Sequence, residues 1–455
     1  RQSYSYELIN VLTYPAALAL VEGGVVGVLA KKAFNVGPFQ FATIMAAPMF
    51  ANLTSFAWAY AARGRRKVAF INLLQVATLL TIAAIALLPT AEPGPMLLTA
   101  LVVAARCLIC GVVTIRSTVW RMNYPRHVRA QVTGRLALIS SLFMAFAPLA
   151  GALLLDANPR GFRLLYLGSA LFAMLGVWGF SHIRLRGERE LIRYEGTPQA
   201  SPQPHGLAAP IYEYDPRQPR RDTFWSVLRR DHLFRSYMLW QFISGVANMT
   251  GEAVIVYVIA SLTANRPAEY LISIALSTVI PLMMAVLTLP RWARLLDRVH
   301  VAEFRCKQAW MWIVSQMGNW IGAALAAEMT GSFWLALAVL AGSRLFQGIS
   351  RGGGMLAWNL GHNDFADRRL VALYMGIHVT LTGIRGAVAP FAGMALYLGW
   401  ERIELPGLGV ALPALEGLGY HVFGLTTLLA VMSEFGFRRL HQTIRNGRSQ
   451  AVPTD

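Results

Sequence analysis

The chain has 455 residues, of which 55% are hydrophobic and only 14% are charged. A soluble chain of ordinary composition carries about 25% charged residues, so this composition indicates a protein embedded in lipid. The formal net charge of +18 would suit nucleic acid, but no recognition motif accompanies it, and we expect no nucleic acid among the partners.

Twelve apolar windows follow one another along the chain, and each is long enough to cross the hydrocarbon core as a helix. They lack the strict two-residue alternation of barrel strands, so we predict an all-α membrane protein with twelve transmembrane helices. The windows are residues 10–31, 37–61, 67–89, 95–118, 130–155, 161–183, 237–262, 267–290, 306–327, 331–352, 369–397 and 416–437.

Basic residues gather in one alternating set of loops. Segments 62–67, 121–130 and 291–298 are rich in arginine, whereas loops such as 90–95 and 264–270 are poor in lysine and arginine. Basic loops of multi-pass proteins face the cytoplasm. We therefore expect both termini to be cytoplasmic. The excess of arginine over lysine suggests a GC-rich bacterial genome, so we expect a multi-pass protein of a bacterial inner (cytoplasmic) membrane.

A charged, proline-rich stretch divides the twelve windows into two groups of six, and it is typical of a flexible linker. We therefore predict four segments. They are an N-terminal six-helix bundle at 1–184, a cytoplasmic linker at 185–235, a C-terminal six-helix bundle at 236–437 and a cytoplasmic tail at 438–455.

The two halves repeat each other in sequence. The segment ARCLICGVVTIRSTVW (105–120) aligns without gaps on SRLFQGISRGGGMLAW (343–358), and VEGGVVGV (21–28) falls on GEAVIVYV (251–258). Halves repeated in parallel sense are typical of one class of secondary transporter, whose binding site lies between the halves near mid-membrane.

Ionisable residues stand near the middle of four of these apolar windows. The alignment pairs Glu22 with Glu252 and Arg106 with Arg344. A charge in hydrocarbon costs about 3 kcal/mol even on a lenient insertion scale. We therefore expect these four side chains to face a polar interior that both halves share.

Several segments make the chain resemble the major facilitator superfamily. RLFQGISRGGG (344–354) resembles the family's fourth-helix arginine motif in its tenth-helix copy, and APLAG (147–151) resembles its fifth-helix motif. AWAYAARGRRK (57–67) and RWARLLDRVH (291–300) stand where the family has its gating loops. The resemblance implies two pseudo-symmetric six-helix bundles whose helices one, four, seven and ten line a central cavity.

The loop motif departs from the family's pattern, because Ala62 stands where the family usually has aspartate and the second copy has lost its glycines. In the family this motif latches the halves together on the cytoplasmic side. Its weakening leaves an alternative open: a non-transporting structural subunit or assembly factor of a larger membrane complex, docked through linker 185–235. The gating-loop candidates are Arg63, Arg65, Asp297 and Arg298.

Polar side chains at helical spacing form one stripe in each of three helices. The stripes are Gln241, Ser244, Asn248 and Glu252 in the seventh helix, Arg344, Gln347 and Arg351 in the tenth, and Tyr374, His378, Thr382 and Arg385 in the eleventh. Arg385 breaks the symmetry between the halves, because it aligns near the uncharged Phe143. Such a charge is a better candidate for solute contact than one that is duplicated.

These patterns predict a secondary active transporter that moves a small organic solute, anionic or zwitterionic, by alternating access coupled to protons. A buried carboxylate beside an arginine can hold or release a proton as the arginine changes partner, so the proton-coupling candidates are Glu22 and Glu252. The substrate-cavity candidates are Arg106, Arg344, Arg385, His378, Asn248, Gln241, Gln347 and Tyr374. The competing interpretation is that the glutamate–arginine pairs only clamp helices together.

Enzyme activity, cofactors and metal are not expected. The chain has no zinc-ligand spacing and no nucleophile motif, and its C-x-x-C pair, Cys107 and Cys110, lies inside a predicted transmembrane helix. A role as small buried residues suits that pair better than redox or metal chemistry. The expected partners are the solute, protons and membrane lipid, with other membrane subunits if the alternative holds.

Overall fold

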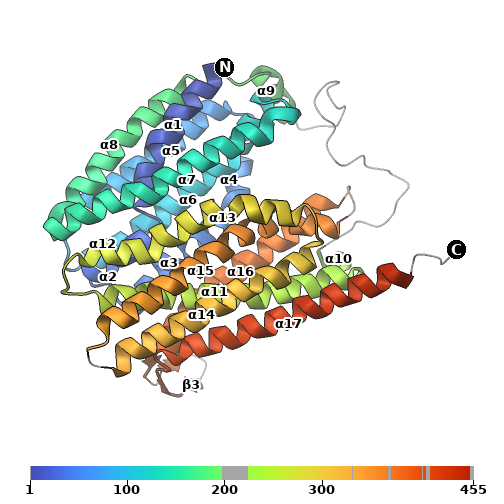
Figure 1. The fold of residues 1–455 in the computed structure, drawn as a ribbon. Coiled ribbons are helices and arrows are strands. Elements are labelled where there is room, and N and C mark those ends of the chain that lie inside the picture. The colour runs from blue at the N-terminus through green and yellow to red at the C-terminus, as the bar shows by residue number, and fades with distance from the viewer. Residues whose placement is uncertain are drawn as a thin grey trace.

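The computed structural model describes residues 2–196, 224–329, 331–366, 370–401, 403–405 and 410–450. Its long helices form two groups that lie against each other, the N-terminal half above the C-terminal half in Figure 1. The N-terminal half consists of α1 (Gln2–Ala19), α2 (Gly23–Lys32), α3 (Pro38–Leu53), α4 (Ser55–Ala61), α5 (Lys67–Ala84), η1 (Ile85–Leu87), α6 (Gly94–Asn123), α7 (Arg126–Ala157), η2 (Pro159–Gly161) and α8 (Phe162–Ser181).

A short helix, α9 (Glu188–Gly196), follows the first half. The C-terminal half then consists of α10 (Phe224–Arg230), α11 (His232–Leu262), α12 (Glu269–Ile274), η3 (Ala275–Val279), α13 (Ile280–Leu296), α14 (Val301–Glu328), α15 (Phe333–Leu360), η4 (Gly361–Asp364), α16 (Val371–Leu398) and α17 (His421–Gln450). Two small antiparallel pairs precede α17, β1 (Gly399–Trp400) with β4 (Leu415–Glu416) and β2 (Ile403–Leu405) with β3 (Val410–Leu412).

All twelve predicted windows lie on helices. Within the described part of the chain, nine helical stretches are long and apolar enough to cross a membrane, judged by length and composition. The other three windows, 37–61, 306–327 and 416–437, lie on α3–α4, α14 and α17. The first of these is interrupted at Thr54, and α17 continues past the predicted boundary at 437. The chain is therefore an all-α, multi-span membrane protein.

The first and the eighth membrane crossings both depart from regular α-helix within their length. The first is interrupted between α1 and α2, where Glu22 adopts extended backbone angles and its carbonyl oxygen accepts the first hydrogen bonds of α2, from Val25 and Val26. The eighth contains a π-helical turn, η3, between α12 and α13. Such turns free main-chain groups for other partners and are common at functional sites.

Charged side chains join the two halves at one end of the bundle. We call the end where α1 begins and α9 lies the linker end, and the end where α2 stops and α12 begins the opposite end (Figure 1). At the opposite end Lys32 Nζ lies 3.3 Å from a carboxylate oxygen of Glu269. The Asp156 carboxylate accepts hydrogen bonds from the main-chain N–H groups of Tyr270 (2.7 Å) and Leu271 (3.0 Å), and so caps α12 from the other half.

Candidate functional site

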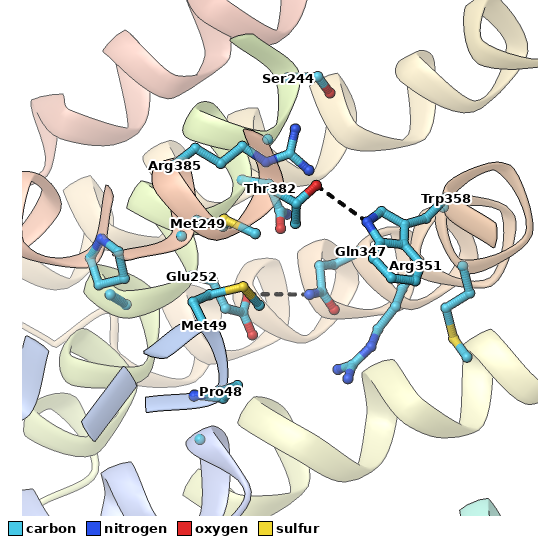
Figure 2. A pocket seen from close by; sticks show the side chains of 18 of the residues that line it. Pro48, Met49, Ser244, Met249, Glu252, Gln347, Arg351, Trp358, Thr382 and Arg385 are labelled. Carbon is cyan, nitrogen blue, oxygen red and sulfur yellow. Dashed lines mark hydrogen bonds between the residues drawn. The ribbon is translucent and has the colours of Figure 1, made fainter. Parts of the chain in front are cut away.

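A cavity of about 550 Å³ lies between the halves, within the range of about 300–1,000 Å³ typical of small-molecule sites. Its wall includes Glu22 and Met45 from the N-terminal half and residues of α11, α14, α15 and α16 from the C-terminal half. It reaches from the level of Glu22 towards Trp358 and Asn359, which lie at the linker end of α15. Figure 2 draws 18 of its residues and labels ten, with Arg385 and Thr382 above Glu252, Gln347 and Arg351.

Glu22 stands in the cavity wall between a cation of its own half and a cation of the other. Arg106 of α6 donates a hydrogen bond from Nη1 to Glu22 Oε2 at 2.8 Å. Nη2 of Arg351, from α15, lies 3.9 Å from the other carboxylate oxygen. Glu22 stands at the break between α1 and α2, where the helix is interrupted, and two glycines, Gly23 and Gly24, directly follow it. A change in the distance between the halves would therefore change the charge that faces Glu22.

Glu252 is held more firmly than Glu22. Arg344 donates to both of its carboxylate oxygens, at 2.9 and 2.7 Å, and Gln347 donates a third hydrogen bond at 3.2 Å. Arg344 is fully buried and also donates to the carbonyl oxygens of Leu276 (3.0 Å) and Ser277 (3.2 Å) in η3. The π turn thus supplies two acceptors that keep the guanidinium in place behind Glu252.

The sequence repeat made the two glutamates equivalent and the two arginines equivalent, and the structure brings each glutamate to the arginine of its own half. The two arginines, Arg106 and Arg344, stand behind the glutamates and are not part of the cavity wall. The halves also touch beside Glu22, where Ser277 Oγ donates to the carbonyl oxygen of Gly24 at 3.4 Å. The duplicated charges therefore lie beside the seam between the halves, and their carboxylates face the cavity.

Arg385, the unsymmetrical charge, lies in the cavity wall as the sequence pattern suggested. Its Nη1 donates to the main-chain carbonyl oxygen of Gln241 on α11, while Nε has no hydrogen-bond partner. The side chain passes over Gly245, where a Cβ would lie 2.1 Å from the Arg385 Cζ. Gln241 and Asn248 line the same wall. A guanidinium held in this way is available to an anionic group in the cavity.

The predicted stripe of α16 divides between the cavity and the protein interior. Thr382 lines the cavity and accepts a hydrogen bond from Trp358 Nε1 at 3.3 Å. His378 is buried outside the wall with its ring edge-on to Trp358, and neither ring nitrogen has a hydrogen-bond partner. Tyr374 lies nearer the linker end and donates to the Asp231 carboxylate at 2.8 Å. Helical spacing aligned these residues correctly, but the cavity covers only part of the stripe.

Sequence reasoning missed three cavity residues on α14, which are Arg305, Gln308 and Trp312. Arg305 Nη1 donates to Gln308 Oε1 at 2.7 Å, and Gln308 Nε2 donates to the Ser350 carbonyl oxygen at 2.8 Å. The resemblance directed attention to helices one, four, seven and ten, and α14 belongs to none of these crossings. Arg305 also lies close in sequence to the basic loop 291–298, so it looked like another loop arginine.

A buried network in the N-terminal half was also missed. Glu7 of α1 is fully buried and accepts hydrogen bonds from Trp120 Nε1 (2.8 Å) and Arg116 (3.3 Å) of α6. Its other carboxylate oxygen accepts a longer hydrogen bond from the hydroxyl of Tyr124 (3.4 Å). These residues do not line the cavity, so the network joins α1 to α6.

The predicted gating loops do not meet each other in the described contacts. Arg63 and Arg65 lie over the rings of Tyr60 and Phe70 in their own half, while Asp297 and Arg298 are exposed at the end of α13. The loop after α4 instead binds α9. The Glu195 carboxylate accepts from Gly64 N–H at 3.0 Å and pairs with Lys67, and Arg66 lies 3.5 Å from Glu188.

Comparison with known proteins agrees with this architecture. The model of the Major Facilitator Superfamily matches residues 14–315. No curated protein matches the sequence. Among solved structures, a mutant of the nucleoside transporter NupG is similar over 97% of this chain and 100% of its own, with a TM-score of 0.64 and 9% identity.

Two other solved structures show the same likeness. A POT family transporter in complex with 5-aminolevulinic acid has a TM-score of 0.64 at 12% identity, over 97% of this chain and 96% of its own. The xylose transporter XylE from E. coli, in an inward open conformation, has a TM-score of 0.57 at 12% identity, over 95% of both chains. At sequence identities this low, the similarity shows a shared fold and does not identify a substrate. With two repeated bundles, a central cavity and a family model matched over most of its length, the chain belongs to the major facilitator superfamily of transporters.

Proposed function

We propose that the chain carries a small organic anion or zwitterion across a bacterial inner membrane, coupled to protons, with both termini in the cytoplasm. The observation that carries this proposal is Arg385, a buried guanidinium in the cavity wall with an unpartnered Nε. Guanidinium groups bind carboxylates and phosphates through paired N–H donors. A wall that offers such a donor set to a cavity of about 550 Å³ suits a small anionic group.

Proton coupling is supported by the surroundings of Glu22. Its carboxylate has one arginine from its own half at 2.8 Å and Arg351 from the other half at 3.9 Å. When the halves rock apart at the linker end or close there, Arg351 moves relative to Glu22. Loss of a nearby positive charge favours the protonated acid. Glu252, with its bidentate partner, is the second candidate for the proton and exchanges it less readily.

The contacts at the opposite end suggest which way the cavity opens. Lys32–Glu269 and the Asp156 cap on α12 hold the halves together there, and the cavity wall extends to the linker end. In our proposal this state is open to the cytoplasm, and transport requires these contacts to break. A purely structural subunit would not need such a cavity. Of the linker 185–235 suggested for docking in that alternative, residues 197–223 lie outside the described residues.

The test is uptake into proteoliposomes under an imposed pH gradient, using a panel of labelled organic acids and amino acids. We expect wild-type protein to concentrate at least one of them in response to the gradient. Glu22→Gln should abolish this pH-driven uptake yet retain exchange of preloaded solute, because exchange needs no net proton movement. Equal uptake with and without a gradient would refute proton coupling. Failure to move any member of the panel, with stable co-purification of another membrane protein, would favour the structural alternative.

A further inference from the structure

Two buried arginines in the cavity wall form no ion pair with a carboxylate of the part of the chain that the structure describes. Arg305 of α14 is 5% exposed and Arg385 of α16 is 6% exposed. Among the described residues of the wall, the acids are Glu22 and Glu252, and each already forms an ion pair at less than 3 Å with an arginine outside the wall. The wall therefore has an excess of positive charge that no ion pair among the described residues neutralises.

These two arginines also have N–H groups without acceptors. Nε and Nη2 of Arg305 and Nε of Arg385 are buried and have no hydrogen-bond partner among the described residues. Each guanidinium has one acceptor, the side-chain oxygen of Gln308 for Arg305 and the main-chain oxygen of Gln241 for Arg385. Buried charges and donors are costly unless they are paired. Free donors on two guanidiniums in the same wall indicate that an anion is the missing partner.

The two guanidiniums stand in the wall of the same cavity, which limits how far apart they lie. Arg305 lies near the start of α14 at the linker end, whereas Arg385 lies in the middle of α16. Their N–H groups are thus offered from two depths of the same cavity. A single monovalent group would leave one of the two charges unneutralised.

We propose that the transported solute carries two negative charges and is bound between Arg305 and Arg385. Organic phosphates and dicarboxylates both meet this description, and both match the planar donor geometry of arginine. This inference rests on the proposed transport function and narrows the class of solute from small anions and zwitterions to divalent anions. It excludes neutral solutes and predicts that monovalent anions and zwitterions bind more weakly than divalent ones of the same size.

The test compares ligands that share a carbon skeleton and differ in charge. Binding of succinate, succinamate and succinamide, and of glycerol 3-phosphate and glycerol, is measured by calorimetry on the purified full-length protein at fixed ionic strength. We expect at least one dianion to bind about tenfold or more tightly than its singly charged or neutral analogue. The stronger of the two dianions identifies the chemical class. Equal binding across each series, or no binding of either dianion, would overturn the inference.

Variants connect the effect to the two arginines. Arg305→Gln and Arg385→Gln should each lower dianion affinity about tenfold while monoanion affinity changes less, because each removes one of two charge partners. The matched control is Arg294→Gln. Arg294 is exposed and lies near the end of α13, at the linker end where Arg305 also lies, and this variant should bind like wild type. Wild-type dianion affinity in Arg305→Gln would refute the assignment.

Folding and function are separated by two further measurements. Since each arginine is an unneutralised buried charge, Arg305→Gln and Arg385→Gln should melt no lower than wild type without ligand, and added dianion should raise the melting temperature of wild type more than theirs. If the dianions fail to bind but wild-type protein still takes up another solute under a pH gradient, the charge assignment is wrong and the transporter proposal stands. If there is neither binding nor uptake, both are wrong.

Discussion

The guanidinium of Arg385 occupies the space that a side chain at position 245 would need. A Cβ built on Gly245 would lie 2.1 Å from Cζ, 2.2 Å from Nε and 2.3 Å from Nη1 of Arg385. Real Cβ atoms do not approach heavy atoms this closely, and here the atoms belong to the charged head of the side chain. The absence of a side chain on α11 therefore determines where the charge of α16 can lie in the cavity.

Gly245→Ala should displace Arg385 and weaken anion binding. The added methyl group would push the guanidinium from its hydrogen bond with Gln241 and away from the anion. A hydrogen bond from a charged donor contributes about 1.5–3 kcal/mol, so loss of one such bond to the anion lowers affinity roughly tenfold or more. Calorimetric titration with the tightest-binding solute measures the loss. Gly342→Ala is the control, because nothing lies within 4 Å of a Cβ at that helical glycine. Equal losses in both variants would show that general helix perturbation is the cause.

The contacts at the opposite end should control access to the cavity from that side. Asp156→Asn removes the charge from the cap on α12, and its hydrogen bonds to the N–H groups of Tyr270 and Leu271 become weaker. We expect the opposite end to open more often. The measurement is labelling of Asn248→Cys, a cavity position, by a membrane-impermeant thiol reagent in a background whose three cysteines are replaced by serine.

Labelling should rise several-fold when the reagent is added from the opposite side and should fall when it is added from the linker side. Glu92→Gln changes an exposed carboxylate in a loop at the same end and should leave labelling unchanged. A rise of equal size from both sides would indicate loosening of the whole protein, which would contradict a gate at Asp156.

The membrane crossings and the two glutamate–arginine pairs could be predicted because they leave strong signals in the sequence. An apolar window of about 20 residues matches the length that a helix needs to cross the hydrocarbon core. The repeat aligned Glu22 with Glu252 and Arg106 with Arg344, and in the structure each glutamate pairs with the arginine of its own half. A charge that appears twice at equivalent positions of an apolar helix can be assigned a partner without coordinates.

Other features of the site left no such signal. Arg305 could not be told from the arginines of the neighbouring basic loop, because only packing shows that its side chain turns into the cavity. The π turn at Ala275–Val279 has no distinctive residues, although two of its carbonyl oxygens accept hydrogen bonds from Arg344. Tyr374 and Arg385 share a helical face, yet only Arg385 lines the cavity, while Tyr374 binds Asp231 nearer the linker end. These outcomes depend on how helices are placed against one another, which periodicity does not encode.

Release of α9 should expose the region after the N-terminal half to protease. Glu195 is the anchor, since its carboxylate accepts from Gly64 N–H at 3.0 Å and pairs with Lys67. Glu195→Gln removes the negative charge that binds Lys67 and the Gly64 N–H, so α9 should detach more often. Limited trypsin digestion should cut at the exposed Arg189 several-fold faster. Glu190→Gln, an exposed glutamate of the same helix, should be cut at the wild-type rate, and equal acceleration in both variants would assign the effect to helix propensity.

The buried Glu7 network should contribute to stability without contributing to solute binding. Glu7→Gln leaves Arg116 without its counter-ion in the interior, and breaking a buried pair costs about 3–5 kcal/mol. We expect a clearly lower melting temperature in detergent, partly restored by adding Arg116→Leu, because the double variant removes the unpaired charge as well. Solute affinity at low temperature should match wild type, since neither residue lines the cavity. The exposed Glu92→Gln variant should melt like wild type. If Glu7→Gln keeps full stability but loses pH-driven uptake, then this carboxylate, and not Glu22 alone, takes part in proton movement.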